Sequence, residues 1–216
     1  MAETLSERLR IGRVAQSAKR RWRKRFYLDG TPENQWCRVV MNRRIAEHLD
    51  GLGSAQLDAI EVSGDLHARR SWKSYRSTDW VTFDVCAPPA NLDPHDVVIC
   101  EQVLEHVPDP WRAAQTLHDL CRPGGNVVVS TPFLIPVHGP PDFWRFSQTG
   151  IRLVLERAGL VVDETGSWGS KRAARGNLRR VPPWKPWRSL RDEFHYPLVV
   201  WALAHRPDDA EAPAPS

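Results

Sequence analysis

Residues 96–133, DVVICEQVLEHVPDPWRAAQTLHDLCRPGGNVVVSTPF, decide the fold of this chain. The apolar run at 97–100 is short and mostly β-branched, which is typical of a strand buried on both faces of a parallel sheet. Pro110 predicts the start of a helix with one apolar face, and Arg-Pro-Gly-Gly at 122–125 predicts its end. A second buried strand follows at 127–129. Because such crossovers make parallel strands, a ligand site is expected beyond the carboxyl ends of the strands.

The flanking sequence predicts the other elements of an α/β domain. Apolar spacing predicts one helix at 34–52, and another that Ser147 caps and that runs to Ala158. Strands are predicted within 57–65, 72–76 and 80–85, from residue 160 onwards, and within 194–205. The basic, tryptophan-containing segment 166–193 is predicted to be a long inserted loop that closes over a substrate or lies on a membrane surface.

Composition limits the class of protein. A chain of 216 residues with 41% hydrophobic and 26% charged residues suits one globular domain with a real core. The apolar run at 198–204 is too short to span a membrane, and the N-terminus has no apolar signal-peptide core. The four cysteines show no paired spacing, so neither a zinc site nor a disulfide framework is predicted, and a reducing cytoplasm is the expected location.

Two terminal segments fall outside the predicted domain. The arm at 1–33 is strongly basic, especially at 19–25, and it suits either a solvated helix or contact with an anionic membrane surface or another polyanion. The aromatic residues Trp22 and Phe26 favour the membrane surface, and nothing else in the sequence supports sequence-specific nucleic-acid binding. The acidic, proline-rich tail at 207–216 is predicted to be disordered.

The order of these motifs resembles a known family. Asp96 with its apolar run, then VLEHVPDP, a helix and LCRPGGNVVVSTPF, is similar to class I S-adenosylmethionine-dependent methyltransferases of the small type 11-like group. The resemblance implies a Rossmann-like domain at 34–206. Its sheet would have seven mostly parallel strands with helices on both faces, and the last strand would run antiparallel at the end of the sheet. Between Glu61 and Asp96 the chain is short for this family, so one crossover helix is expected to be lost.

The resemblance also implies S-adenosylmethionine as cofactor and names its contacts. They lie in the loops after the first, third and fourth predicted strands: Glu61, Ser63, Gly64, Asp84, Val85, Glu101 and Gln102. Ser63 and Asp65 depart from the family pattern because glycine is common at both positions. No acid stands at the end of the second predicted strand to bind the ribose, and Asp84 also suits a plain turn residue.

A proline-rich loop after residue 130 carries the candidate catalytic groups. His138 suits a general base that Asp142 orients, while Trp144 and Arg145 suit substrate binding. An alternative is that Asp142 and Arg145 pair and tie the loop down. His106 is a further candidate base or substrate contact, although Glu105 or His106 could instead fix the loop by hydrogen bonds.

No metal is predicted, because Gln102 stands where some quinone-pathway O-methyltransferases that resemble this chain have a third, carboxylate ligand beside their Glu-His pair. The favoured function is methyl transfer from S-adenosylmethionine to a small-molecule, sugar or lipid-linked acceptor, as O-methylation. The alternatives are a catalytically inactive methyltransferase fold that serves as a binding or scaffold protein, and a peripheral membrane or polyanion binder. The fold alone does not choose between them.

Overall fold

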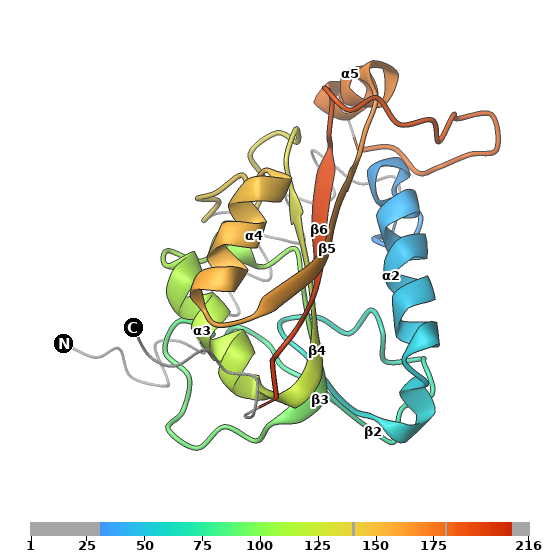
Figure 1. Cartoon of the computed structure of the whole chain (residues 1–216). Helices are drawn as coiled ribbons and strands as arrows, with labels where there is room; N and C mark the ends of the chain where they lie inside the picture. The colour runs from blue at the N-terminus through green and yellow to red at the C-terminus, as the bar shows by residue number, and fades with distance from the viewer. Residues whose placement is uncertain (1–30, 140, 180, 209–216) are drawn as a thin grey trace.

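A computed structural model describes residues 31–139, 141–179 and 181–208 (Figure 1). Residues 1–30 of the predicted arm and 209–216 of the predicted tail lie outside the described residues. The helices are η1 (Trp36–Arg38), α2 (Val39–Gly51), η2 (Ser54–Gln56), η3 (Leu104–His106), α3 (Pro110–Leu120), α4 (Gln148–Arg157) and α5 (Lys171–Arg179). The strands are β1 (Asp58–Glu61), β2 (Ser74–Ser77), β3 (His95–Glu101), β4 (Cys121–Pro132), β5 (Val161–Trp168) and β6 (Val199–His205).

The strands form one mixed sheet in the order β2-β1-β3-β4-β6-β5. Strands β2, β1, β3 and β4 are parallel, and β6 is antiparallel to both of its neighbours. From β1 the chain moves outward to β2, whereas from β3 it moves outward in the other direction to β4. The strand order therefore reverses between β1 and β3, and open α/β sheets bind ligands at this point, beyond the carboxyl ends of the strands.

Two layers of helices cover the sheet, with α3 and α4 on one face and α2 on the other (Figure 1). Successive side chains of a strand point to opposite faces, so neighbouring residues join different cores. Ile60 and Val98 belong to the cluster that includes α3 and α4, while Ala59 and Val97 belong to the cluster that includes α2. The predicted Rossmann-like fold with helices on both faces is confirmed.

The stretch that predicts the fold forms its expected unit of strand, helix and strand. The Asp109 side chain caps α3 by accepting a hydrogen bond from the Arg112 N–H at 2.9 Å, and Pro110 occupies the first helical turn. The turn at 122–125 ends the helix as predicted, but it lies within β4 as an irregularity in the pairing with β3. Gly124 has a φ of +72°, a left-handed conformation that suits glycine.

The strand predicted at 80–85 is wrong, because these residues form consecutive turns. The Asp79 carboxylate accepts a hydrogen bond from the Val81 N–H at 2.9 Å. The Asp84 carboxylate accepts one from the Cys86 N–H at 2.9 Å. Such local side-chain to backbone bonds compete with the ladder of a sheet, and here they outweigh the β-branched and aromatic composition.

Three further corrections concern the sheet and its connections. The described residues form six strands rather than seven, and the interval 62–94 contains neither of the two crossover helices, although only one was expected to be lost. β6 is antiparallel as predicted, but it lies between β4 and β5 instead of at the end of the sheet. The reason is burial: six of its seven residues are buried, as suits an interior strand, whereas β5 alternates towards solvent.

The segment 166–193 is not a loop throughout. It begins with the end of β5 and contains α5. Trp168 is almost fully buried, and its indole N–H donates to the Leu190 carbonyl at 2.9 Å. The indole of Trp36 donates to the Ser189 carbonyl at 3.0 Å, so the segment packs against the start of the domain.

Candidate active site

In open α/β sheets the ligand crevice is expected where the strand order reverses, which here is between the loop after β1 and the loop after β3. Ser63 in the first loop and Gln102 in the second both have a φ of 57°. Among the described residues they are the two non-glycine residues with positive φ. Such conformations cost about 1–3 kcal/mol each and cluster at functional sites. The two strained residues thus lie in the two loops between which the strand order predicts a ligand site.

Glu61, at the end of β1, holds the first loop together. Its buried carboxylate accepts hydrogen bonds from the backbone N–H groups of Leu66 and His67, each at 2.9 Å. The Tyr75 hydroxyl on β2 donates a third bond at 2.7 Å. A carboxylate has about four acceptor positions, so one position is left for a ligand hydroxyl or amine.

Gly64 brings the backbone of the first loop close to the Glu61 carboxylate. A Cβ atom at residue 64 would lie 2.5 Å from Glu61 Oε1, which is too close without a shift of that side chain. The loop therefore keeps a glycine where the backbone of residue 64 approaches the Glu61 carboxylate. This residue is the one glycine of the predicted cofactor loop that the sequence retains.

A second hydrogen-bonded group connects the two loops. Glu101 Oε1 lies 2.7 Å from His67 Nε2, and the Ser130 hydroxyl donates to Glu101 Oε2 at 3.0 Å. Burial opposes ionisation of Glu101, but the hydrogen bond with His67 and the positive charge of Arg38 lower its pKa. Gln102 donates its backbone N–H to the Ser130 carbonyl at 2.7 Å. Glu101 and Gln102 therefore lie in contact with the loop after β1 and with β4, and their contact with the cofactor stays a prediction.

Asp84 and Val85, predicted to contact the adenine, lie in the turns that replace the predicted strand. The Asp84 carboxylate caps the turn through Cys86, and the Val85 side chain is buried in the core cluster that contains α3. Their proposed contact with the cofactor stays a prediction.

Glu105, in η3, is a buried carboxylate in an unusual position. Its side chain is fully buried, and neither oxygen has a hydrogen-bond partner in another described residue. Burial raises its pKa to about 8. Of the two side chains that the sequence offers for fixing the loop by hydrogen bonds, His106 does so through Nδ1, 2.6 Å from the Pro141 carbonyl oxygen, whereas that of Glu105 does not. The Glu105 backbone carbonyl does so instead, by accepting from the Phe143 N–H at 2.7 Å.

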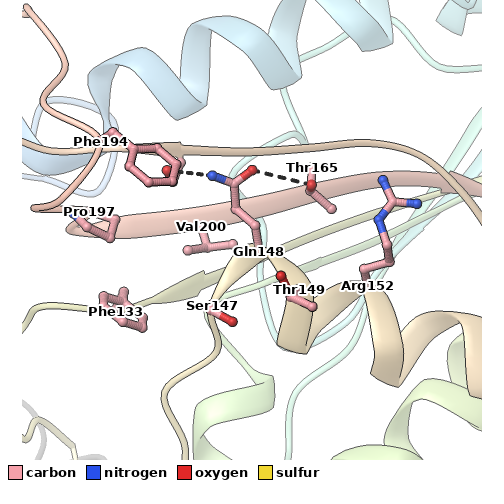
Figure 2. Close-up of a pocket in the computed structure, with 10 residues that line it drawn as sticks. Phe133, Ser147, Gln148, Thr149, Arg152, Thr165, Phe194, Pro197 and Val200 are labelled. Carbon is pink, nitrogen blue, oxygen red and sulfur yellow. Dashed lines mark hydrogen bonds between the residues drawn. The ribbon is translucent and has the colours of Figure 1, made fainter.

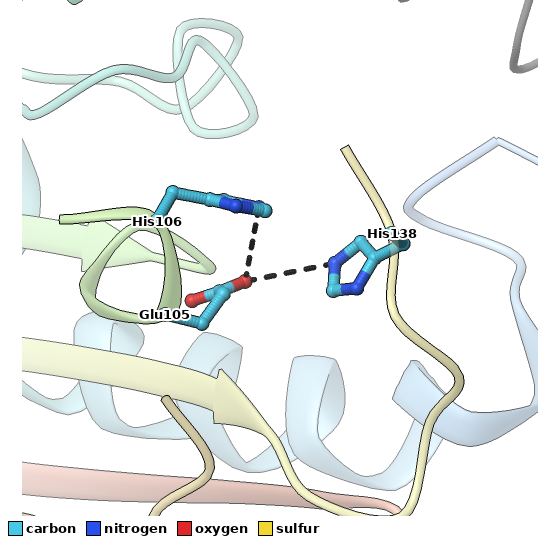
Figure 3. Close-up of side chains that lie close together, drawn as sticks. All are labelled: Glu105, His106 and His138. Carbon is cyan, nitrogen blue, oxygen red and sulfur yellow. Dashed lines mark ion pairs between the residues drawn. The ribbon is translucent and has the colours of Figure 1, made fainter. Parts of the chain in front are cut away.

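Two histidines flank this carboxylate (Figure 3). His106 Nε2 lies 3.6 Å from Glu105 Oε1, and His138 Nε2, from the loop after β4, lies 3.8 Å from the same oxygen. The imidazole rings meet edge to face with their centroids 5.1 Å apart. The structure thus brings together the two histidines that the sequence singles out, and it adds Glu105 between them.

Asp142 supports His138, and Arg145 supports Asp142. Asp142 Oδ2 accepts from the His138 backbone N–H at 2.8 Å and lies 3.3 Å from His138 Nδ1. Arg145 forms an ion pair with the buried Asp142 carboxylate, as the loop-tying alternative expects. Burial, reinforced by His106, lowers the pKa of His138 to about 4, so its ring is neutral at neutral pH.

Trp144 packs into the domain rather than standing free in the loop. It contacts the core cluster that contains α3, and its ring lies edge to face with Trp111. The indole N–H donates to the Val107 carbonyl at 2.8 Å. These contacts join the loop after β4 to the segment after β3.

A separate hollow of about 360 Å³ lies between the start of α4 and strands β5 and β6 (Figure 2). Gln148 crosses it and donates to the Ser167 hydroxyl at 2.9 Å. Phe133 and Phe194 are on its apolar side. None of the residues predicted for cofactor binding or catalysis lines it.

Sequence reasoning missed three site residues, His67, Tyr75 and Ser130. Each acts through a carboxylate, either Glu61 or Glu101. Nothing in their spacing indicates these contacts, because each partner lies on a different strand or loop. The sequence does show the two carboxylates that these residues contact, because Glu61 and Glu101 each stand at the end of a buried strand.

With this geometry in place, the comparisons with known proteins give the class. Residues 30–165 match the methyltransferase domain family, and the chain belongs to that family. The predicted recognition of an S-adenosylmethionine-dependent methyltransferase is confirmed.

The chain is similar to two ubiquinone biosynthesis O-methyltransferases. The protein from Aeromonas salmonicida is 51% identical over 80 residues, which cover 37% of this chain and 29% of that protein. The protein from Marinobacter nauticus is 32% identical over 123 residues, which cover 56% of this chain and 47% of that protein. The chain thus spans less than half the length of these relatives.

A solved structure supports the same fold. An S-adenosylmethionine-dependent methyltransferase from Clostridium acetobutylicum superposes with a TM-score of 0.51 at 8% identity, covering 90% of this chain and 99% of that one. At this identity the likeness concerns the fold alone. None of the helices within the described ranges has the length and apolar character needed to cross a membrane.

Proposed function

We propose that this chain transfers a methyl group from S-adenosylmethionine to the hydroxyl oxygen of an acceptor that carries an apolar or lipid portion. One observation carries the proposal: the segment after β3 places Gln102 at the crevice and, directly afterwards, the Glu105–His106 pair that faces His138. The first part suits a cofactor, and the second suits removal of a proton from a hydroxyl. The similarity to O-methyltransferases over part of the chain supports the choice of oxygen.

The residues of the crevice fit the cofactor. Bound S-adenosylmethionine supplies an activated methyl group, and the protein aligns the acceptor for in-line displacement. Ser63, Gly64 and Gln102 border the crevice and are the proposed contacts, with Glu61 and Glu101 holding the two loops behind them. The remaining acceptor position on Glu61 would take a polar group of the cofactor.

The histidines provide the proposed path for the proton. As the acceptor oxygen bonds to the methyl carbon, its proton passes to the neutral ring of His138, which Asp142 orients at Nδ1. His106 contacts the acceptor from the other side. Trp144 and Arg145, already engaged with the loop, act by positioning it.

The rim of the catalytic loop favours an acceptor with an apolar part. Leu134, Val137 and Phe143 are exposed, and Val137, next to His138, is 74% exposed. Exposed apolar side chains around a catalytic group are typical of a surface that contacts an apolar ligand. A lipid-linked hydroxyl fits this rim better than a bare sugar does.

Transfer of a radiolabelled methyl group from S-adenosylmethionine tests the proposal. The acceptors would be hydroxylated compounds with and without an alkyl tail, together with their amine analogues. We expect transfer to tailed hydroxyl acceptors and a roughly hundredfold lower rate in His138→Gln. His205→Gln, a histidine paired with Asp163 elsewhere, should keep the full rate. Transfer to amines alone would contradict the proposal, and no transfer with no cofactor binding would favour a scaffold protein.

We also infer that the segment around α5 contacts an anionic lipid surface. Leu178, Trp187 and Phe194 are exposed, and Lys171, Arg172 and Lys185 are exposed around them. Val199 pairs with both Pro132 and Trp168, so this segment leaves the sheet at the same edge as the catalytic loop. Figure 1 shows α5 at that end of the sheet. The apolar groups and positive charge complement an anionic membrane surface.

Co-sedimentation with vesicles tests this contact. Binding to phosphatidylglycerol vesicles should fall with added salt, exceed binding to phosphatidylcholine vesicles, and weaken several-fold in Trp187→Ala. Trp80→Ala, an exposed tryptophan in the turns after β2, is the matched control and should bind as the natural protein does. Equal binding to both kinds of vesicle, or an equal loss in both variants, would contradict the inference.

A further inference from the structure

We infer that Glu105, His106 and His138 form a binding site for one divalent transition-metal cation, which the sequence alone does not predict. One ligand atom from each residue lies within 4.8 Å of the other two. Glu105 Oε1 is 3.6 Å from His106 Nε2 and 3.8 Å from His138 Nε2. A tetrahedral cation with bonds of about 2.1 Å needs ligand atoms roughly 3.4 Å apart, so small side-chain movements would close the site.

The orientation of both rings suits a cation. His106 Nδ1 lies 2.6 Å from the Pro141 carbonyl oxygen, which makes Nδ1 the protonated nitrogen and leaves the Nε2 lone pair towards Glu105. His138 Nδ1 lies 3.3 Å from the nearby acceptor Asp142 Oδ2, but it has no hydrogen-bond partner among the described residues. Metal-bound histidines commonly have such an acceptor behind the second ring nitrogen, because it fixes the tautomer and the ring orientation.

Burial supplies a reason for a ligand. The Glu105 side chain is fully buried, yet neither oxygen bonds another described residue, and a buried polar group without a hydrogen bond is costly. The side chains of His106 and His138 keep exposures of 23% and 26%, so a cation could enter between them. Arg145, a nearby positive group, is paired with Asp142.

The ligand set indicates the class of cation. Two imidazoles and one carboxylate suit Zn²⁺, Co²⁺ or Fe²⁺, whereas Mg²⁺ and Ca²⁺ prefer oxygen ligands. The absence of a carboxylate at residue 102 does not matter for this site, because the third ligand comes from the loop after β4. Three protein ligands also leave a position open for an exogenous oxygen.

The consequence for catalysis rests on the proposed methyl transfer to a hydroxyl, and it replaces the proposed proton path through His138. An acceptor hydroxyl at the open position would have its pKa lowered by the cation, so the proton could leave to solvent as the oxygen attacks the methyl carbon. His138 would then serve as a ligand, and the cation would replace it in activating the hydroxyl. Binding of the cation itself needs neither the cofactor nor the acceptor.

Titration of the metal-stripped full chain with Co²⁺ tests the site, because bound Co²⁺ of low coordination number absorbs visible light. We expect one bound cation per chain, a parallel calorimetric signal with Zn²⁺, and no comparable signal with Mg²⁺. Glu105→Gln and His138→Gln should each weaken Co²⁺ binding by about a hundredfold or more, since a lost ligand should cost at least as much as a lost second-shell partner. His205→Gln should bind as the natural protein does.

Two outcomes would overturn the inference. One is no Co²⁺ or Zn²⁺ binding at millimolar concentration to protein that circular dichroism shows to be folded. The other is binding that both Glu105→Gln and His138→Gln leave unchanged. Neither readout needs methyl transfer, so failure of the proposed function would leave this test intact. Glu105→Gln keeps the side-chain shape, and the thermal transition of each variant shows that it folds.

Discussion

Glu61 and Glu105 are both buried carboxylates near the carboxyl edge of the sheet, yet their surroundings are opposite. Glu61 accepts three hydrogen bonds, from Leu66, His67 and Tyr75. Glu105 accepts none from another described residue, and two imidazoles lie 3.6 and 3.8 Å from its Oε1. A satisfied buried carboxylate stabilises its loop, whereas an unsatisfied one costs stability.

The difference separates the site into two halves. On the β1 side the Glu61 carboxylate is part of the scaffold, and it fixes the loop that borders the proposed cofactor crevice. On the side of η3 and the loop after β4, the Glu105 carboxylate makes no hydrogen bond with another described residue. No other described residue would therefore lose a hydrogen-bond partner if this carboxylate were replaced. Groups that reduce stability persist where a function requires them, so Glu105 is the stronger functional candidate.

The same substitution at the two positions should give different results, with the largest loss at Glu61. Glu61→Gln places an amide N–H against donors that need an acceptor. We expect the free energy of unfolding to fall by about 2–4 kcal/mol. Urea denaturation measures it, and a change below the experimental error would show that the three hydrogen bonds do not hold the loop.

Tyr75→Phe should have a smaller effect at the same carboxylate. It removes one hydrogen bond to a charged group and leaves the ring in place. We expect a loss of about 1.5 kcal/mol, with the backbone donors of residues 66 and 67 still engaged. Hydrogen exchange of these two amides should speed up only modestly, and full loss of their protection would contradict the account.

Glu101 should contribute a pH-dependent stability, smaller than the contributions of Glu61 and Tyr75. Its folded pKa is lowered despite burial, chiefly by the hydrogen bond with His67, so its contribution is present above pH ~4.5 and is lost as the pH falls through the folded value. Glu101→Gln should therefore be less stable at pH 7 and lose less stability on acidification. Parallel acid titrations of the two proteins, followed by fluorescence, would contradict this assignment if their slopes below pH ~4.5 were equal.

The smallest effect is expected at Glu105. In metal-free buffer at pH 7, Glu105→Gln should change the free energy of unfolding by less than about 1 kcal/mol, because no donor in another residue loses its partner. Urea denaturation beside Glu61→Gln gives a matched comparison. A loss as large as that of Glu61→Gln would show that Glu105 is a structural residue.

The sequence predicts the parts of this fold that local pattern determines. The strands at 97–100 and 127–129 and the intervening helix follow from apolar runs, a proline and a cap, all within one short stretch. The strand expected at 80–85 fails because Asp79 and Asp84 bond to nearby backbone, a local choice that composition does not reveal.

The site is predictable in part for a similar reason. Glu101 and Gln102 follow directly from the end of a buried strand. The contact of Glu105 with His138 joins segments that only the folded loop brings together, and the missing hydrogen bonds of Glu105 depend on every residue around it. The positive φ of Ser63 is likewise a property of the fold, since the sequence shows only that a glycine is missing.

Calorimetric titration with S-adenosylmethionine tests the central claim that the crevice beside Glu61 holds the cofactor and the Glu105 side does not. We expect micromolar binding by the natural protein and by Glu105→Gln, and at least tenfold weaker binding by Gly64→Ala, whose Cβ would displace the Glu61 carboxylate. No binding by folded natural protein at millimolar cofactor would contradict the claim. If Gly64→Ala bound the cofactor as the natural protein does and Glu105→Gln lost binding, the cofactor would lie beside Glu105 and the claim would be contradicted.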